Sequence, residues 1–171
     1  AKFARMPIVA DLSALSAADR AVLDAVLPAA RQMDAIFLRQ VWAGNVKLQD
    51  ELKTWDPGAS RTAAEALFRI HRGPWDRLDD RRPFLGNRPH PEGAGFYPED
   101  LTRAEFEAYL SAHPEKKEAL TSLTTVVERD GQNLKAIPYR QAYAEWLNPA
   151  AAALRDAAAK ATNASLKRFL E

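Results

Sequence analysis

Histidine is the side chain best suited to chemistry in this 171-residue sequence, which contains three: His71, His90 and His113. None lies four positions from another, and none is followed by Glu. No helix face can therefore present two imidazole ligands and a general base to a zinc ion. The simpler interpretation puts His71 at the end of a helix and the other two, each followed by proline, in loops. We expect no metal site in this chain.

Other catalytic patterns are also missing from the sequence. It contains no cysteine, which excludes thiolate nucleophiles and disulfides. No serine lies in the Gly-x-Ser-x-Gly pattern of a nucleophile elbow. No Lys-Ser or Lys-Thr pair follows Gly73, Gly86, Gly93 or Gly95, so these glycines form no phosphate loop. We expect no catalytic residue here, and no activity from this chain alone.

The charge and hydropathy patterns exclude two further classes of protein. The formal net charge is +1, and the lysines and arginines are spread along the chain without a basic stripe. Nucleic-acid binding needs such a stripe, so we expect no nucleic-acid partner. No apolar run approaches the ~20 residues that cross a bilayer, so no membrane span is expected.

Apolar spacing of three and four residues predicts a mainly α fold. After an extended lead-in over residues 1–15, Ser16 caps a long helix from Ala17 to about Ala43, which Pro28 should kink or split. Ser60 should cap a later helix that ends at Gly73, and Thr102 with Glu105 forms a capping box. The helix that follows Thr102 should carry Phe106, Tyr109 and Leu110. Further helices are expected over 46–55, 139–147, 149–162 and 165–170, with a short helical turn opening at Pro114.

Two short apolar runs predict a single β-hairpin. Residues 123–127 and 134–137 are the expected strands, with a turn at Asp130-Gly131 inside a loop longer than two residues. The expected fold is an irregular helical domain with one small β-hairpin and a long Pro/Gly-rich loop. We expect it to form a single domain over residues 1–171.

The long loop, residues 73–101, is the most informative part of the sequence. It is rich in Pro, Gly and Arg and shows no periodicity, and long loops of this kind are often functional. It contains the run Gly93-Ala94-Gly95-Phe96-Tyr97-Pro98, whose glycines allow a close backbone approach. Phe96 and Tyr97 could line a peptide-binding cleft or anchor the loop on the helices, and both roles remain open here.

Several segments, in this order, resemble the N-terminal region of bacterial zinc metallopeptidases of the dipeptidyl peptidase III family. The resemblance covers about Leu12 to Glu171, and its segments are 33–40, Gly73-Pro74-Trp75-Asp76-Arg77, the 93–98 run with Thr102 and Phe106, 134–139 and 165–170. It implies a two-domain enzyme that removes dipeptides from peptide N-termini. The resemblance also implies a zinc ion held by a His-Glu type motif in the C-terminal lobe of such an enzyme. This chain departs from that pattern, since it contains no His-Glu pair.

The resemblance therefore implies a role for this chain as a non-catalytic lobe beside the substrate cleft. Its partners would be the catalytic lobe of the parent protein and the peptide substrate, with Phe96 and Tyr97 as the cleft contacts. A free-standing helical module that binds a protein or peptide is the alternative. The last helix is still apolar and periodic at Glu171, which leads us to expect a fragment of a larger enzyme.

Overall fold

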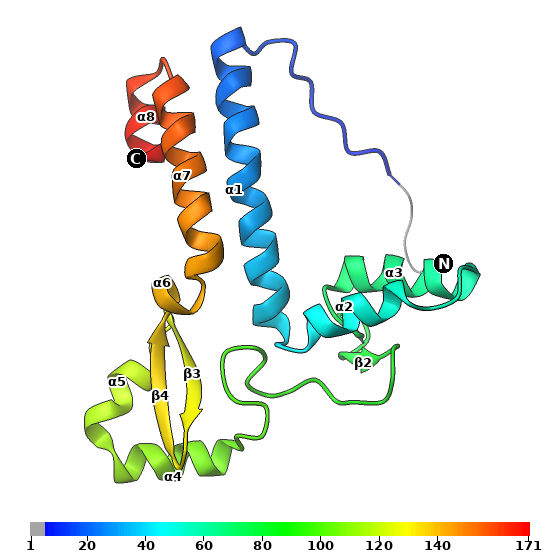
Figure 1. The fold of residues 1–171 in the computed structure, drawn as a ribbon, viewed down its shortest axis with the longest axis vertical. Helices are drawn as coiled ribbons and strands as arrows, with labels where there is room; N and C mark the ends of the chain where they lie inside the picture. The colour runs from blue at the N-terminus through cyan, green and yellow to red at the C-terminus, as the bar shows by residue number, and fades with distance from the viewer. Residues whose placement is uncertain (1–5) are drawn as a thin grey trace. The chain divides into compact units, whose positions relative to one another are not determined.

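The computed structural model describes residues 6–171, and residues 1–5 of the predicted lead-in lie outside the described residues. Residues 6–16 contain no helix or strand. The rest of the described chain forms eight α-helices, one short 3-10 helix and two sheets of two strands each (Figure 1). The prediction of a mainly α fold is therefore confirmed.

The long helix α1 (Ala17–Val41) begins where the sequence predicts. The Ser16 hydroxyl accepts a hydrogen bond from the Asp19 N–H at 3.1 Å, which confirms the predicted N-cap. The expected split at Pro28 is wrong, because the helix runs through this proline without a break. A proline removes one backbone donor, and in α1 buried residues on both sides, such as Val22 and Ile36, hold the remaining turns in place.

Helices α2 (Asn45–Lys53) and α3 (Ala59–His71) pack together on a core of Leu38, Leu52, Ala64 and Phe68. The cap of α3 is Gly58, so the prediction of Ser60 is wrong by two residues. At its other end Arg72, with a φ of 56°, takes the left-handed conformation one residue before Gly73, where the sequence predicts that the helix ends. Helix α3 therefore ends on an arginine whose guanidinium pairs with Asp34.

Strands β1 (Trp75–Asp76) and β2 (Arg82–Pro83) form an antiparallel pair that the sequence does not predict. Two-residue strands carry no periodicity, so no pattern signals them. Asp80 and Arg81, in the turn between these strands, take φ values of 46° and 55°. From residue 84 to residue 102 the chain forms turns and bends without a helix or strand.

Helix α4 (Arg103–Ala112) begins at the predicted cap, where the Thr102 hydroxyl accepts a hydrogen bond from the Glu105 N–H at 3.1 Å. The 3-10 helix η1 (Pro114–Lys116) begins at the predicted proline and leads into α5 (Lys117–Leu120). These elements pack on one side of the hairpin over a core of Leu120, Val127 and Leu134. In Figure 1, α4 and α5 border the two strands.

The predicted hairpin consists of β3 (Thr125–Asp130) and β4 (Asn133–Pro138), which pair antiparallel from Thr125–Pro138 to Asp130–Asn133. The prediction that more than two residues connect the hairpin strands is wrong, because the strands continue to a two-residue turn at residues 131–132. Gly131 takes a φ of 60° there, which glycine adopts without a steric penalty. The polar ends of the strands hid their true length from the hydrophobic pattern.

The C-terminal helices are α6 (Tyr139–Ala142), α7 (Ala144–Lys160) and α8 (Ala164–Leu170). The predicted boundary at Asn148-Pro149 is wrong, because α7 runs through Pro149 and the break lies at Tyr143. Pro149 is the sixth residue of α7, and the helix continues past the one backbone donor that this proline lacks. Asn163, rather than Ser165, caps α8 by accepting from the Ser165 and Leu166 N–H groups.

The described residues divide into two compact units. The first comprises the chain up to Arg31 together with Asn148–Glu171, and its core is Val22, Ala157, Ala158 and Leu170. The second comprises Gln32–Leu147 and contains the other two cores, the long loop and the hairpin. That residues 1–171 fold as one domain stays a prediction.

Within the second unit, Gly95 lies against the last turn of α1. Its N–H donates to the Gln40 carbonyl at 2.8 Å, which satisfies an acceptor that the end of the helix leaves open. A Cβ added at position 95 would lie 2.9 Å from the Arg39 carbonyl carbon and closer still to its oxygen. The sequence predicts that a glycine of this run allows a close approach, and Gly95 is the residue that does so.

We predict that Gly95→Ala destabilises the chain by about 3 kcal/mol, because a new methyl group must displace backbone rather than a flexible side chain. Gly58→Ala is the matched control, since a Cβ at position 58 meets nothing within 4 Å. Urea unfolding of both variants measures the difference. Equal stability of the two variants would contradict this close approach.

Candidate functional site

A cavity of about 210 Å³ lies in the second unit, where the ends of α1 and α3 meet the 74–96 segment. Five of its residues are apolar and come from α1 and the long loop, and two are arginines of the β1–β2 turn. Its lining consists of Phe37, Gln40, Val41, His71, Trp75, Arg77, Arg81, His90, Ala94 and Phe96. We call it the Trp75 pocket.

Trp75 is the fixed part of this pocket. Its side chain is 2% exposed, and its indole N–H donates to the Arg88 carbonyl at 2.8 Å. The ring makes edge contacts with Trp42 and His90, at centroid distances of 5.4 and 4.8 Å. Such aromatic pairs add to the free energy of burial, so Trp75 pins the first half of the loop to the helices.

His71, the last residue of α3, contacts the first residues of the long loop. It is 3% exposed, and its Nδ1 accepts a hydrogen bond from the Arg77 N–H at 3.1 Å. Its Nε2 lies 3.7 Å from Asp76 Oδ1, and that carboxylate oxygen also accepts from the Leu78 N–H. The prediction that His71 lies at the end of α3 is confirmed. These contacts fix the end of β1 and the backbone of Arg77, which follows it.

The charged residues that line the pocket are cationic. Arg77 and Arg81 contribute guanidinium groups, and no Asp or Glu belongs to the lining. The Arg77 guanidinium lies 5.9 Å from the centre of the Phe37 ring, which places positive charge beside an aromatic face. Arg81 follows Asp80 in the left-handed region, a conformation that costs about 1–3 kcal/mol for a non-glycine residue.

His90 contacts the Trp75 ring and lines the pocket together with Arg77 and Arg81. Partial burial, followed by the nearby positive charge of Arg81, lowers the pKa of His90 below its ordinary value of 6.5. The imidazole is therefore mostly neutral at pH 7. A neutral ring adds no charge to the pocket and can act as either a donor or an acceptor.

The two predicted cleft residues face different surroundings. Phe96 is half-buried, lines the Trp75 pocket and stacks on Tyr139 with a centroid distance of 6.3 Å. Tyr97 packs instead on the hairpin core, makes an edge contact with Phe106 and donates its hydroxyl to the Leu120 carbonyl at 3.2 Å. Phe96 thus has a face toward a cavity, and Tyr97 anchors the loop.

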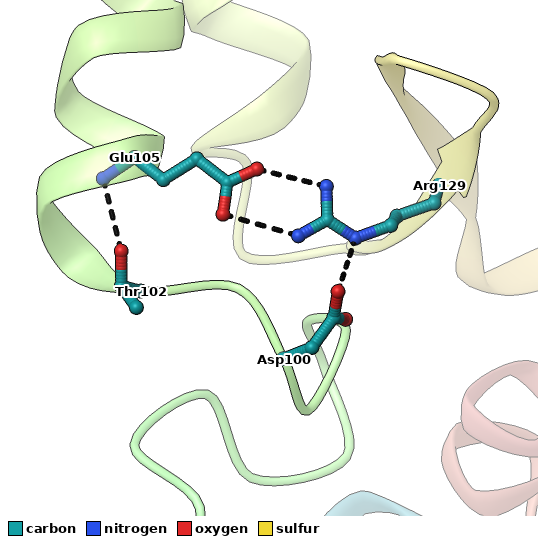
Figure 2. Close-up of polar contacts among 4 residues, drawn as sticks. All are labelled: Asp100, Thr102, Glu105 and Arg129. Carbon is teal, nitrogen blue, oxygen red and sulfur yellow. Dashed lines mark hydrogen bonds and ion pairs between the residues drawn. The ribbon is translucent and has the colours of Figure 1, made fainter.

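Backbone and ion-pair contacts hold the second half of the loop on the hairpin. The Val127 N–H donates to the Phe96 carbonyl at 2.7 Å. Figure 2 shows the Arg129 guanidinium gripping Glu105 through two bonds of 2.9 and 3.1 Å and Asp100 through a third of 2.7 Å. The bond from Arg129 lowers the pKa of Glu105, and these partners raise that of Arg129. The loop is tied at both ends.

The described residues offer no fit for a zinc ion. Residues 6–171 contain no group of three or more His, Cys, Asp or Glu side chains that could hold a metal. The histidines lie on separate elements: His71 ends α3, His90 is in the loop and His113 lies between α4 and η1. Over the same residues, no helix is both long and apolar enough to cross a membrane.

Sequence reasoning missed Phe37, Arg77 and Arg81 as members of one site. Phe37 falls on the apolar face of α1, where the pattern signals a core residue, yet it is exposed in the structure. The two arginines alternate with aspartates, and that alternation favours local ion pairs. The sequence does place both arginines within a few residues of Trp75, and this nearness could have indicated that they share a site.

The chain is similar to solved structures of a larger peptidase. No protein-family model matches it. The structure of dipeptidyl-peptidase III from Corallococcus sp. strain EGB superposes with a TM-score of 0.93 and 38% identity, over 99% of this chain and 32% of that one. The structure of DPP III from Caldithrix abyssi superposes with a TM-score of 0.89 and 43% identity, over 94% of this chain and 30% of that one.

Among curated proteins, Nudix hydrolase 3 of Arabidopsis thaliana is 27% identical, over 99% of this chain and 28% of that protein. The chain thus spans about a third or less of the length of each of these relatives. Its fold matches one region of these longer dipeptidyl-peptidase III chains. That region is the N-terminal part of dipeptidyl-peptidase III-like peptidases, so the resemblance found in the sequence is confirmed.

We predict that folding stability falls as the pH drops through and below 6.5, in part because of His90. The folded state holds the pKa of this imidazole below its unfolded value, so the unfolded chain takes up the proton first. His90→Asn should therefore lose less stability than the parent chain between pH 7 and pH 5.

An NMR titration should place the His90 pKa below 6.5 and show it rising in Arg81→Gln but not in Arg140→Gln. A His90 pKa at or above 6.5 would contradict this.

Proposed function

We propose that this chain is the non-catalytic N-terminal lobe of a dipeptidyl peptidase III-like zinc peptidase, and that it packs beside the substrate cleft. The observation that carries this proposal is the match to two dipeptidyl-peptidase III structures over 94% and 99% of this chain but only 30% and 32% of theirs. The greater part of such a protein then lies outside this sequence.

The residues that zinc-dependent peptide hydrolysis requires support the proposal that this chain is a non-catalytic lobe. Zinc-dependent peptide hydrolysis needs three protein ligands, an open coordination position and a general base. The described residues gather no such group, and we assign the zinc and its base to the remaining catalytic lobe as part of this proposal. This lobe acts by positioning the peptide and by excluding water when the cleft closes.

Phe96 is the residue that we assign to the cleft, and Tyr97 supports it. Phe96 exposes part of its ring to the Trp75 pocket while its backbone is held by Val127. Tyr97 is turned the other way into the hairpin core, so it positions its neighbour without touching a ligand. Together they give a rigid aromatic surface, which contacts a peptide at low cost in conformational entropy.

Exposed apolar side chains support contact with another part of the parent protein. Leu78, Leu123 and Phe169 are 72%, 91% and 84% exposed. Water contact with large aliphatic and aromatic side chains is unfavourable, and burying each against a partner would stabilise the assembly by about 1.5–3 kcal/mol. The catalytic lobe is the partner that the comparisons favour.

A free-standing helical module that binds a protein or peptide is the second candidate function. The similarity to a protein named Nudix hydrolase 3 favours it, because the same region then occurs in chains that carry the names of different enzymes. At 27% identity this similarity is weaker than the structural match to dipeptidyl-peptidase III.

The gene distinguishes the two candidates directly. We expect its reading frame to continue past the codon for Glu171 into a region that encodes a His-Glu zinc motif. The protein from the whole frame should contain zinc and release dipeptides from peptide N-termini, whereas residues 1–171 alone should release none. A frame that stops at Glu171, or that continues without such a motif, would exclude the peptidase lobe and leave the binding module.

Within that whole protein, Phe96→Ala should raise the KM for dipeptide release about tenfold and leave kcat unchanged. Loss of an apolar contact made equally in the ground and transition states acts in this way, and tenfold corresponds to 1.4 kcal/mol. Tyr97→Phe is the control: it loses only the hydroxyl bond to Leu120 and should cost about 1 kcal/mol of stability with unchanged kinetics. An unchanged KM in Phe96→Ala would remove Phe96 from the cleft.

A further inference from the structure

We propose that the Trp75 pocket binds a carboxylate attached to an aromatic or aliphatic side chain, with Arg77 and Arg81 on the carboxylate and the apolar group against Phe37 and Phe96. A peptide C-terminus and a small free acid both have this chemistry. The inference concerns ligand binding by this chain, so it stands whether or not the parent protein is a peptidase.

The shape of the pocket limits the size of the ligand. Its volume of about 210 Å³ is below the 300–1,000 Å³ usual for drug-sized ligands, so it has room for one side chain with its attached carboxylate. The walls are aromatic on several sides, from Phe37, Trp75 and Phe96. An apolar side chain is therefore favoured inside, and the charged group must remain at the arginines.

The arginines are available to an anion. Arg72, Arg88 and Arg129 in the same unit each pair with a carboxylate of the chain. The ion pairs formed among residues 6–171 include neither Arg77 nor Arg81. No Asp or Glu belongs to the pocket lining, and Asp76 lies 3.7 Å from the Nε2 of the lining residue His71, so the groups that an incoming carboxylate meets at the lining are cationic or apolar. Guanidinium groups bind carboxylates through two parallel hydrogen bonds, which selects this anion by shape.

The structure also holds these two arginines near the pocket. The Arg77 backbone N–H is bonded to His71, and the Arg77 guanidinium lies over the Phe37 ring. Arg81 lies in a turn with two consecutive left-handed residues, and this turn is closed by a hydrogen bond of 2.8 Å from the Arg82 N–H to the Asp79 carbonyl. A fixed backbone reduces the ordering that ligand binding must supply.

A larger hollow between α2 and α3, about 460 Å³ in volume, does not share these features. Its lining includes Glu65, and two of its three cations already have partners: Lys53 pairs with Asp50 and Arg72 with Asp34. This hollow therefore lacks an uncompensated pair of cations and serves as an internal comparison.

NMR titration of the 1–171 chain with N-acetylphenylalanine, and separately with N-acetylphenylalaninamide, tests the proposal. The acid should shift the Trp75 indole N–H and the His90 ring signals and should bind about tenfold more tightly than the amide, a ratio equal to 1.4 kcal/mol. The tripeptide Ala-Ala-Phe and its amide form a second pair of probes. Equal acid preference in both pairs identifies a peptide C-terminus, whereas preference in the first pair alone identifies a small acid.

Arginine variants localise the effect. Arg77→Gln and Arg81→Gln should each weaken binding of the acid about tenfold, and the double variant should bind acid and amide alike. Arg140→Gln removes an exposed cation elsewhere in the same unit and should bind as the unchanged chain does. The acid–amide comparison in the unchanged chain does not depend on any variant folding. Equal binding of acid and amide, shifts confined to the α2–α3 hollow, or no shift at saturating acid would each overturn the proposal.

Discussion

The Gly95 backbone touches the last turn of α1, and the position of the whole candidate site depends on this contact. Its N–H bonds the Gln40 carbonyl, and no room remains for a side chain against Arg39. One residue later, the Phe96 carbonyl accepts a bond from Val127 in β3. The loop therefore joins a helix end to a hairpin through consecutive backbone groups, which places the Phe96 ring at the pocket with little freedom.

The ends of the loop are held by different kinds of interaction. Trp75 is buried in an aromatic cluster at one end, and the Arg129 ion pairs secure the other. Aromatic burial acts at every pH and salt concentration, whereas exposed ion pairs are weakened by salt and by protonation of their carboxylates. A long loop whose only regular structure is two strands of two residues can thus be as well positioned as a helix or sheet, which is what a ligand-contacting loop requires.

The residues that line the Trp75 pocket are of types that bind ligands through apolar contact and charge. The lining of the Trp75 pocket offers aromatic surface from Phe37, Trp75 and Phe96 and positive charge from Arg77 and Arg81. Such a surface can select and orient a ligand without reacting with it. That property suits one region of a larger enzyme, and the match to about a third of the dipeptidyl-peptidase III chains is consistent with it.

Local rules determined much of the secondary structure from the sequence alone: the Ser16 and Thr102 caps, the proline that opens η1, the hairpin and the mainly α class all follow from short-range geometry. The ordered motifs also carried the family resemblance. Tertiary structure decided where helices continue through Pro28 and Pro149, because packing on both sides outweighs the loss of one backbone bond. It also separated Phe96 from its neighbour Tyr97 and brought Arg77 and Arg81 to Phe37, since which groups meet across 40 or more residues depends on packing that no local pattern records.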